Sequence, residues 1–452
     1  MSFIKENSIK YLVIVTTIIL YFLFAYQLER TQFVNLLVLY ACLFASYFYL
    51  LKKNNNEFKF LVGIAVLYRL VFLFAIPNLS QDFYRFIWDG RLIFEGLNPY
   101  LYLPEDFINQ QQFPVNQAQE LYTSMGALNG SHFTNYPPIN QLCFFIAAVL
   151  ANKSIMGAVI VMRLLIIFAD IGIIYFGKKI LTQLKLPTGA IFLYALNPFI
   201  IIELTGNLHF EPVMLFFLVW SIYLLLKKQQ LWAAAVFALS ISVKLIPLLF
   251  LPLFFQWFVK NEHAFKKGIA TLAAFYGVVL AVTLLLFLPF YTPELIANYS
   301  NSVGLWFRNF EFNASFYYIF REIGYVFRGY NEIAIIGKIM PAMTILFLGW
   351  ITLFRKNKQP KQLLTAMLFG ISFYYFTTTT MHPWYLATLI LLTTFTRYRF
   401  PIIWSVAIVL SYQAYANTPW QENLWLVAIE YVIMYSFLIW EITNKKRSIL
   451  LL

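Results

Sequence analysis

The stretch QDFYRFIWDGRLIFEGLNPYLYLP, residues 81–104, lies between apolar segments that are each long enough to cross a bilayer. Asp82, Arg85 and Asp89 stand at helical spacing and share one face. The apolar side consists of Phe83, Phe86, Ile87 and Phe94. This pattern predicts an amphipathic helix at the membrane surface, with its polar face toward solvent or a cavity. Because charges beside a membrane are costly unless paired or used, we expect this loop to carry a catalytic carboxylate.

The composition indicates that the remaining chain is a membrane scaffold. Of the 452 residues, 61% are hydrophobic and 12% are charged; soluble domains have roughly 45–50% apolar and about 25% charged residues. The apolar residues recur in runs of about 20, the length of a spanning helix. We therefore predict an all-α polytopic membrane helical bundle of about 12–14 spans with amphipathic outer-loop helices.

The predicted organisation has four consecutive parts. These are N-terminal spans (1–77), an outer catalytic loop with a juxtamembrane helix (78–135), a membrane core (136–400) and C-terminal spans (401–452). The net charge of +13 comes from short basic clusters between apolar runs. Positive-inside topology explains such clusters better than nucleic-acid binding does, and it places the loop 78–135 outside.

Several local predictions accompany this topology. Residues 105–135 are expected to be irregular, residues 188–204 a span and residues 205–211 an outer turn. The run 231–259 is expected to break into a hairpin near Lys244, because one long helix would bury that lysine. Segment 139–151 is short for a crossing and is interpreted as re-entrant or surface-lying; if it crosses, the middle spans invert and the shared outer site fails.

Unusual polar residues collect at the predicted outer face. The candidate catalytic residue is Asp82, and the candidate substrate-binding residues are Arg85, Asp89, Arg91, Tyr136, His209, Glu211, Lys244, Arg308, His382 and Trp384. A carboxylate there could be a general base that removes a proton from an acceptor hydroxyl. Cations at headgroup level could hold a phosphate that leaves with developing negative charge. Together these groups describe transfer of a group from a lipid phosphate to a hydroxyl.

Each of these residues also has a structural interpretation. Asp82 could cap its helix or pair with Arg85, Lys244 could snorkel, and His382 could be an interfacial anchor. Asp170 is expected to form a structural buried pair with Arg163. The spacing demands no metal, and neither a P-loop, a GxGxxG motif nor a serine elbow is present. We therefore predict no metal and no cofactor.

Four motifs, in order, resemble those of the GT-C superfamily of membrane glycosyltransferases. They are DFYRFIWDGRLIFEGLNPYLYLP followed by NYPPINQLCFF, then LYALNPFIIIELTGNLHFE, then SVKLIPLLFLPLFF, and finally MHPWYL. The likeness covers roughly residues 78–385 and is greatest to bacterial polyprenol-phosphate mannosyltransferases of glycosyltransferase family 87. A more distant likeness is to the mannosyltransferase of GPI-anchor synthesis. The chain departs from the family where relatives often have two adjacent acids and it has Gln81-Asp82, and at Glu211, where they often have an aspartate.

The resemblance implies inverting transfer of a hexose, usually mannose, from a polyprenyl-phosphate sugar to a glycan, lipid or protein acceptor. It implies Asp82 as the base, with Lys244 and Arg308 as phosphate contacts. The expected location is a bacterial plasma membrane, multi-pass, with the site on the extracytoplasmic side. Two alternatives stay open: a transporter or flippase of a lipid-linked saccharide, and an assembly subunit without catalysis. The partners expected are the lipid-linked donor, the acceptor and membrane lipid, without nucleic acid.

Overall fold

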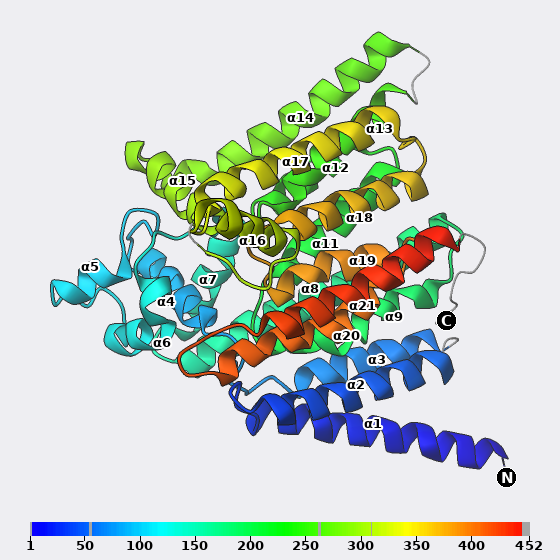
Figure 1. The fold of residues 1–452 in the computed structure, drawn as a ribbon, viewed down its shortest axis with the longest axis horizontal. Helices are drawn as coiled ribbons and strands as arrows, with labels where there is room; N and C mark the ends of the chain where they lie inside the picture. Colours follow the sequence, from blue (N-terminus) through cyan, green and yellow to red (C-terminus); the bar gives the residue numbers. More distant parts are fainter. Residues whose placement is uncertain (1, 54–56, 261–263, 309, 445–452) are drawn as a thin grey trace. The chain divides into compact units, whose positions relative to one another are not determined.

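The apolar runs of the sequence fold into helices (Figure 1). The computed structural model describes residues 2–53, 57–260, 264–308 and 310–444, without the side chains of residues 2–7 and 306–308. In this part of the chain the regular elements are helical, apart from an isolated parallel bridge between Phe312 and Thr380. The predicted all-α polytopic membrane bundle is confirmed.

Six of the described helices are long and apolar enough to cross a membrane. They are α1 (Ser2–Tyr26), α2 (Phe33–Lys53), α8 (Ile155–Gln183), α14 (Phe265–Phe287), α17 (Ile333–Phe354) and α21 (Leu424–Thr443). A bent pair, Thr188–Ala195 with Pro198–Gly206, would be a seventh. The count of about 12–14 spans treats shorter apolar helices as crossings as well, and that count stays a prediction.

The shorter apolar helices have 10–17 residues. They are α7 (Pro138–Ala151), α11 (Glu211–Leu226), α12 (Gln230–Ile241), η3 with α13 (Ile246–Leu253, Phe254–Val259), η5 with α19 (Pro383–Leu386, Ala387–Thr393) and α20 with η6 (Phe400–Ala407, Ile408–Ala416). The break between α12 and η3 contains Lys244, so the predicted interruption of this run is confirmed.

The described chain divides into two compact units that are each assembled from separate stretches. Unit 1 contains Met1–Ser80, Arg163–Pro212 and Pro383–Leu452, and unit 2 contains Gln81–Met162 and Val213–His382. The predicted four consecutive parts describe sequence order only and stay a prediction.

In unit 1, α1 and α2 lie side by side, and α3 (Phe58–Leu70) packs against α1 (Figure 1). Arg69 of α3 is buried and pairs with Asp170 of α8, with 2.7 Å between Nε and Oδ2. Tyr194 in α9 (Phe192–Ala195) donates its hydroxyl to the other oxygen of Asp170 at 2.9 Å. The predicted Arg163–Asp170 pair is therefore wrong, although Asp170 does lie in a buried ion pair.

Arg163 is occupied by backbone carbonyls instead. It donates to Thr205 O at 2.8 Å, to Gly206 O at 2.9 Å and to Leu73 O at 3.0 Å. Thr205 and Gly206 end a π-helical turn, η2 (Ile201–Gly206). Before η2, the chain forms η1 (Thr188–Ile191), α9 and α10 (Pro198–Ile200). A helix end leaves carbonyls without intrahelical donors, and the guanidinium supplies those donors.

The segment predicted as one straight span is bent by 52° between Ala195 and Pro198. Proline cannot continue the helical hydrogen bonding, and the Asn197 side chain accepts from Phe199 N at 3.0 Å to start the next helix. Residues 205–211, predicted as an outer turn, are buried. Their polar side chains are held inside unit 1 rather than displayed on a loop.

In unit 2, the region 105–135, predicted to be irregular, contains α5 (Pro104–Asn109) and α6 (Ala118–Gly130). That prediction is wrong because Ala118, Leu121 and Met125 recur at helical spacing, and all three are buried. The later loop 291–331 likewise contains α15 (Pro293–Arg308) and α16 (Phe316–Arg328), after the short η4 (Leu288–Phe290). Helix α18 (Pro360–Thr377) packs against α17 in the same unit.

Candidate active site in the first loop

Helix α4 (Asp82–Phe94) carries the charged residues of the opening stretch. The helix is amphipathic, and Asp82 lies in its first turn, where a negative charge is favoured by the helix dipole. Asp82 is half-buried, whereas Arg85 and Asp89 are buried. The predicted helix is confirmed, and most of its polar face packs into protein rather than facing water.

Arg85 and Asp89 form the centre of a buried network. Arg85 Nε lies 2.8 Å from Asp89 Oδ1. Arg85 Nη1 also donates to the backbone carbonyls of Asn129 and His132, the latter at 2.9 Å. Gln141 of α7 donates to Asp89 Oδ2 at 3.1 Å. These bonds tie α4 to α7 and to the linker after α6, so Arg85 and Asp89 have a demonstrable structural role.

Asn129 of α6 contacts the candidate base directly. Its Nδ2 donates to Asp82 Oδ1 at 3.2 Å and to Met125 O at 3.1 Å. A neutral donor fixes the carboxylate orientation while leaving the group able to act as a base. Sequence reasoning missed Asn129 because the region was expected to be irregular, although the periodic apolar residues of α6 could have placed it on a helix.

A kink in α6 allows the start of α4 to approach. Gly126 has φ +79°, in the left-handed region that favours glycine. A side chain there would also meet Gln81 Nε2 at 2.9 Å, and Gln81 Nε2 lies 3.3 Å from Met125 O as a hydrogen-bond donor. The residue before the candidate base is therefore held against α6 by a contact that requires glycine.

Helix α7 packs closely on the other side of α4. A Cβ on Gly90 would lie 2.2 Å from Phe144 O, so only glycine permits this approach. The rings of Phe86 and Phe144 stack at 4.6 Å between centroids. Tyr136 precedes α7 and packs edge-on against both rings. Its carbonyl accepts from Tyr100 OH at 2.7 Å, so Tyr136 contributes to the frame of the loop.

Arg91 lies away from Asp82. Nine positions along a helix turn a side chain to the opposite face. Arg91 donates to Asn116 O and, at 3.2 Å, to Gln117 Oε1. Burial lowers the pKa of Arg91 to about 10, against the opposing effect of the Glu120 carboxylate. The structure therefore does not bring Arg91 and Asp82 together.

The start of α7 also contacts the turn that carries Lys244. Ile139 N and Asn140 N donate to Ser242 O at 2.9 and 3.3 Å. Lys244 follows two residues later and is half-buried. Within unit 2, α7 thus touches both the helix of the candidate base and the turn of the candidate phosphate ligand.

His382 lies within the electrostatic influence of the same lysine. Burial, together with the Lys244 charge, lowers the pKa of His382 to about 3, so this imidazole is neutral at ordinary pH. Its ring packs against Phe310 and Phe312, with centroids 5.8 and 5.6 Å away. The neighbouring bridge, in which Met381 N donates to Phe312 O at 2.8 Å, holds this arrangement. A lysine cation beside a neutral imidazole can receive an anion such as a phosphate.

Three predicted site residues lie in unit 1. His209 and Trp384 stack with centroids 3.8 Å apart and an interplanar angle of 17°. His209 Nε2 lies 3.9 Å from Glu203 Oε2, and Glu203 also accepts from Tyr412 OH. Glu211 is buried. His209 therefore lies between Trp384 and Glu203 in unit 1, and Glu203 was not among the predicted site residues.

The structure does not test two further predictions, the role of Arg308 and the absence of a metal. Arg308 ends α15, and its side chain lies outside the described residues. Among the residues that the structure describes, no group of three or more His, Cys, Asp or Glu could hold a metal ion. The absence of a metal and of a cofactor stays a prediction.

Comparison with known proteins assigns a family to this arrangement. Residues 13–260 match a family described as alpha-(1->6)-mannopyranosyltransferase, N-terminal domain. The match includes Asp82, Asn129 and Lys244, and ends before His382.

A curated relative is Alpha-(1->6)-mannopyranosyltransferase A of Mycobacterium tuberculosis. It is 23% identical over 217 residues, which are 48% of this chain and 40% of the relative. The aligned region thus spans less than half of that protein. Because the family match extends over more than half of the 452 residues, this chain belongs to the alpha-(1->6)-mannopyranosyltransferase family.

Proposed function

We propose that this chain is a membrane mannosyltransferase that moves mannose from a polyprenyl-phosphate sugar to an acceptor hydroxyl. The hydrogen bond from Asn129 to the half-buried Asp82 carries the proposal, because it orients a carboxylate at the edge of the loop. The family description supports mannose as the sugar and an α-1,6 linkage in the product. The chain would then be an extracytoplasmic enzyme of the GT-C type.

The proposed reaction is an inverting displacement. Asp82 removes the proton of the acceptor hydroxyl as the oxygen attacks the anomeric carbon. The bond from that carbon to the polyprenyl-phosphate oxygen breaks, and the electron pair leaves with the phosphate. Attack from the face opposite the leaving group inverts the anomeric centre. The proton ends on Asp82, and water carries it away after the product dissociates.

Lys244 is proposed to stabilise the departing phosphate. Its ammonium is a compact positive charge on a flexible stem, which suits a headgroup at the edge of a membrane. His382 stays neutral beside it and can donate one hydrogen bond without adding a second charge. The Lys244 charge would then balance the negative charge that develops on the departing phosphate.

The decisive experiment uses the purified full chain in nanodiscs, with polyprenyl-phosphate mannose and an α-mannoside acceptor. We expect a product with a new α-1,6 linkage, identified by linkage analysis, and little transfer from polyprenyl-phosphate glucose. Asp82→Asn should abolish transfer while the protein stays folded. Full activity in that variant would remove Asp82 as the base.

A matched liposome experiment distinguishes the proposed enzyme from the alternative, a flippase of a lipid-linked saccharide. A flippase would carry the lipid-linked sugar across the bilayer without forming any transfer product. Measured flipping by the wild-type protein, with no product at any acceptor concentration, would replace the proposed enzyme with a transporter. Transfer from donor supplied on only one side of the bilayer, compared with the protein's orientation, would identify the face of the site.

A further inference from the structure

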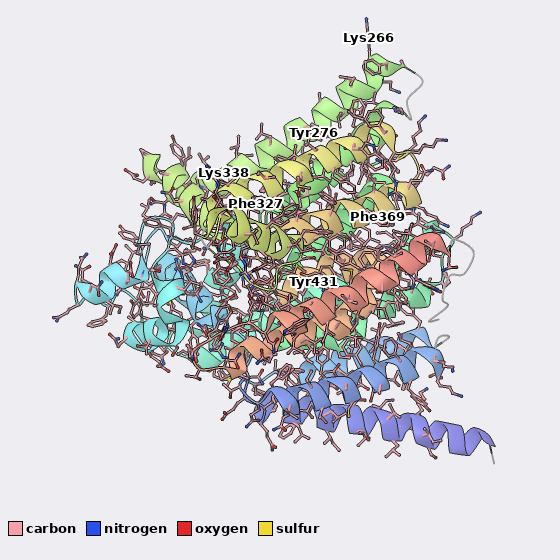
Figure 2. The ribbon with its side chains drawn as sticks, viewed as in Figure 1. Lys266, Tyr276, Phe327, Lys338, Phe369 and Tyr431 are labelled. Carbon is pink, nitrogen blue, oxygen red and sulfur yellow. The ribbon has the colours of Figure 1, made fainter. Side chains whose placement is uncertain are left out.

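Helix α16 exposes apolar side chains, whereas a helix on the surface of a water-soluble protein exposes mainly polar ones. Large apolar side chains recur along it at helical spacing and are exposed; they form the α16 stripe: Phe316, Ile319, Phe320, Ile323, Val326 and Phe327. Val326 is 83% exposed and Phe327, labelled in Figure 2, is 80% exposed. Water penalises exposed apolar area by roughly 25 cal/mol per Å². A contiguous stripe of this kind marks an interaction surface.

Part of the opposite face of α16 is polar and is held by unit 2, while Glu322, Tyr325 and Arg328 are exposed there. Arg321 donates to Glu311 Oε1 at 2.8 Å, and Tyr317 OH donates to Glu311 Oε2 at 2.7 Å. Asn331 also donates to Glu311 Oε2 at 3.3 Å. The Arg321 guanidinium lies 4.4 Å from the Tyr318 ring centre. Protein groups thus partner the polar face, and the apolar face is left outward.

The neighbouring span fixes the depth of α16. Gly324 faces Glu332 and Ile336 at the start of α17, since a Cβ there would lie 3.5 and 3.9 Å from them. Lys338 is exposed two positions further along α17 (Figure 2). A lysine on the surface of a spanning helix holds its charge at headgroup level. Helix α16 therefore contacts α17 near the boundary between headgroups and hydrocarbon.

The exposed surface of α17 is apolar on both sides of Lys338. Ile335, Ile339 and Leu346 are exposed along it. Helix α17 is long and apolar enough to cross a membrane, and in a bilayer these side chains would face lipid. Helix α16 packs directly on α17, so the α16 stripe continues a surface that would face lipid.

We propose that α16 lies in the membrane interface, with the α16 stripe inserted among the acyl chains of one leaflet. The occupant is bilayer lipid, and the helix neither crosses the membrane nor stands in water. The polar network of Glu311, Arg321 and Tyr317 then lies on the protein side of the helix, screened from hydrocarbon. This inference does not depend on the sugar, the donor or the base.

Site-directed spin labelling in nanodiscs tests the insertion. A background without native cysteines (Cys42→Ser with Cys143→Ala) receives a single nitroxide at Val326→Cys or Ile323→Cys. The matched control is Tyr325→Cys, an exposed position of the same turn on the other face. Leu346→Cys on α17 is the positive control for lipid exposure. All four positions lie on the surface, so folding is checked by a single monodisperse peak in gel filtration.

We expect labels at 326 and 323 to collide with oxygen severalfold more than with a water-soluble nickel chelate, as the label at 346 does. The label at 325 should show a lower oxygen-to-nickel ratio. Equal nickel access at 326 and 325 would place the stripe in water and overturn the proposal. Low access to both reagents at 326 would indicate a second copy of the chain or another protein over the stripe, and would equally overturn it.

Discussion

Two aspartates of this protein, Asp170 and Asp82, differ in what surrounds them. In unit 1, Asp170 accepts hydrogen bonds on both oxygens, from Arg69 and Tyr194, and is closed off from solvent. In unit 2, Asp82 stays half-buried and accepts from the neutral Asn129. An acceptor hydroxyl can reach a carboxylate that is partly exposed, whereas it cannot reach one that is enclosed by protein groups. Accessibility, rather than charge near a membrane, therefore distinguishes the candidate catalytic acid.

The sharpest test of this comparison is Asp82→Asn. Loss of a general base should lower the rate of mannosyl transfer by roughly 10²–10⁴-fold, because proton removal from the acceptor is no longer assisted. Transfer of radiolabelled mannose measures it. Asp106→Asn, at an exposed acid of α5 in the same loop, should keep full activity. Equal loss in both variants would mean that the loop tolerates no change of charge.

Asp170→Asn should act on stability instead. It leaves the Arg69 guanidinium buried without its counter-charge, and breaking such a pair costs about 3–5 kcal/mol. The apparent melting temperature in detergent should fall, and transfer per folded molecule should stay near the wild-type value. A variant with unchanged stability and no transfer would reverse the comparison and make Asp170 the functional acid.

Lys244→Gln should mainly weaken donor use. A charge-assisted bond to phosphate contributes about 1.5–3 kcal/mol, which corresponds to a rise in the KM for the polyprenyl-phosphate donor of about ten- to a hundred-fold. Initial rates over a range of donor concentrations measure it. Lys260→Gln, at an exposed lysine after α13, is the control. Unchanged kinetics in Lys244→Gln would exclude this lysine from the site.

Asn129→Ala should produce a smaller and more specific change. Removing the donor disfavours the charged carboxylate of Asp82, so the acid limb of the rate profile should move to higher pH. Rates measured across pH in this variant, with Gln119→Ala on the exposed side of α6 as control, test the effect. A uniform loss at every pH would give Asn129 a structural role only.

His382→Gln should have the smallest effect, visible only in the pH dependence of stability. The folded-state pKa of His382 is about 3 and its ordinary value is 6.5. Below pH 6.5 the unfolded chain binds a proton that the folded chain does not, so stability is lost as pH falls toward 3. The variant should flatten part of this loss in melting temperatures. An unchanged curve would mean that His382 protonates normally in the folded protein.

The sequence reading was most successful where one pattern decides the structure. Helix α4 and the break at Lys244 follow from apolar periodicity and from the cost of burying a lysine. It failed where tertiary partners decide. The sequence around Arg163 does not indicate that it binds the carbonyls of Thr205 and Gly206. The sequence around Arg69 likewise does not indicate that it pairs with Asp170. The bend at Pro198 was not predicted, although proline interrupts helical hydrogen bonds and could have indicated it.

The residue types of the candidate site could be predicted from the sequence, but the contacts between those residues could be predicted only in part. Asp82, Lys244 and His382 were identified as polar groups in apolar surroundings. Asn129 was not identified, because it lies in a stretch with several other amide side chains and nothing in the sequence distinguishes it from them. Its contact with Asp82 is seen only in the structure, next to the kink at Gly126. Arg85 and Asp89 have the charge of ligands, but their hydrogen bonds hold α4 against α7 and the linker that follows α6.

The discontinuous make-up of unit 1 has a consequence for biogenesis. One of its three stretches begins at Pro383, beyond all of unit 2 in the sequence. Because translation proceeds from the N-terminus, the contacts of Tyr412 with Glu203 and of Ser405 with Asn197 can form only after the whole of unit 2 has been made. A stop codon before Pro383 would therefore remove both contacts from unit 1.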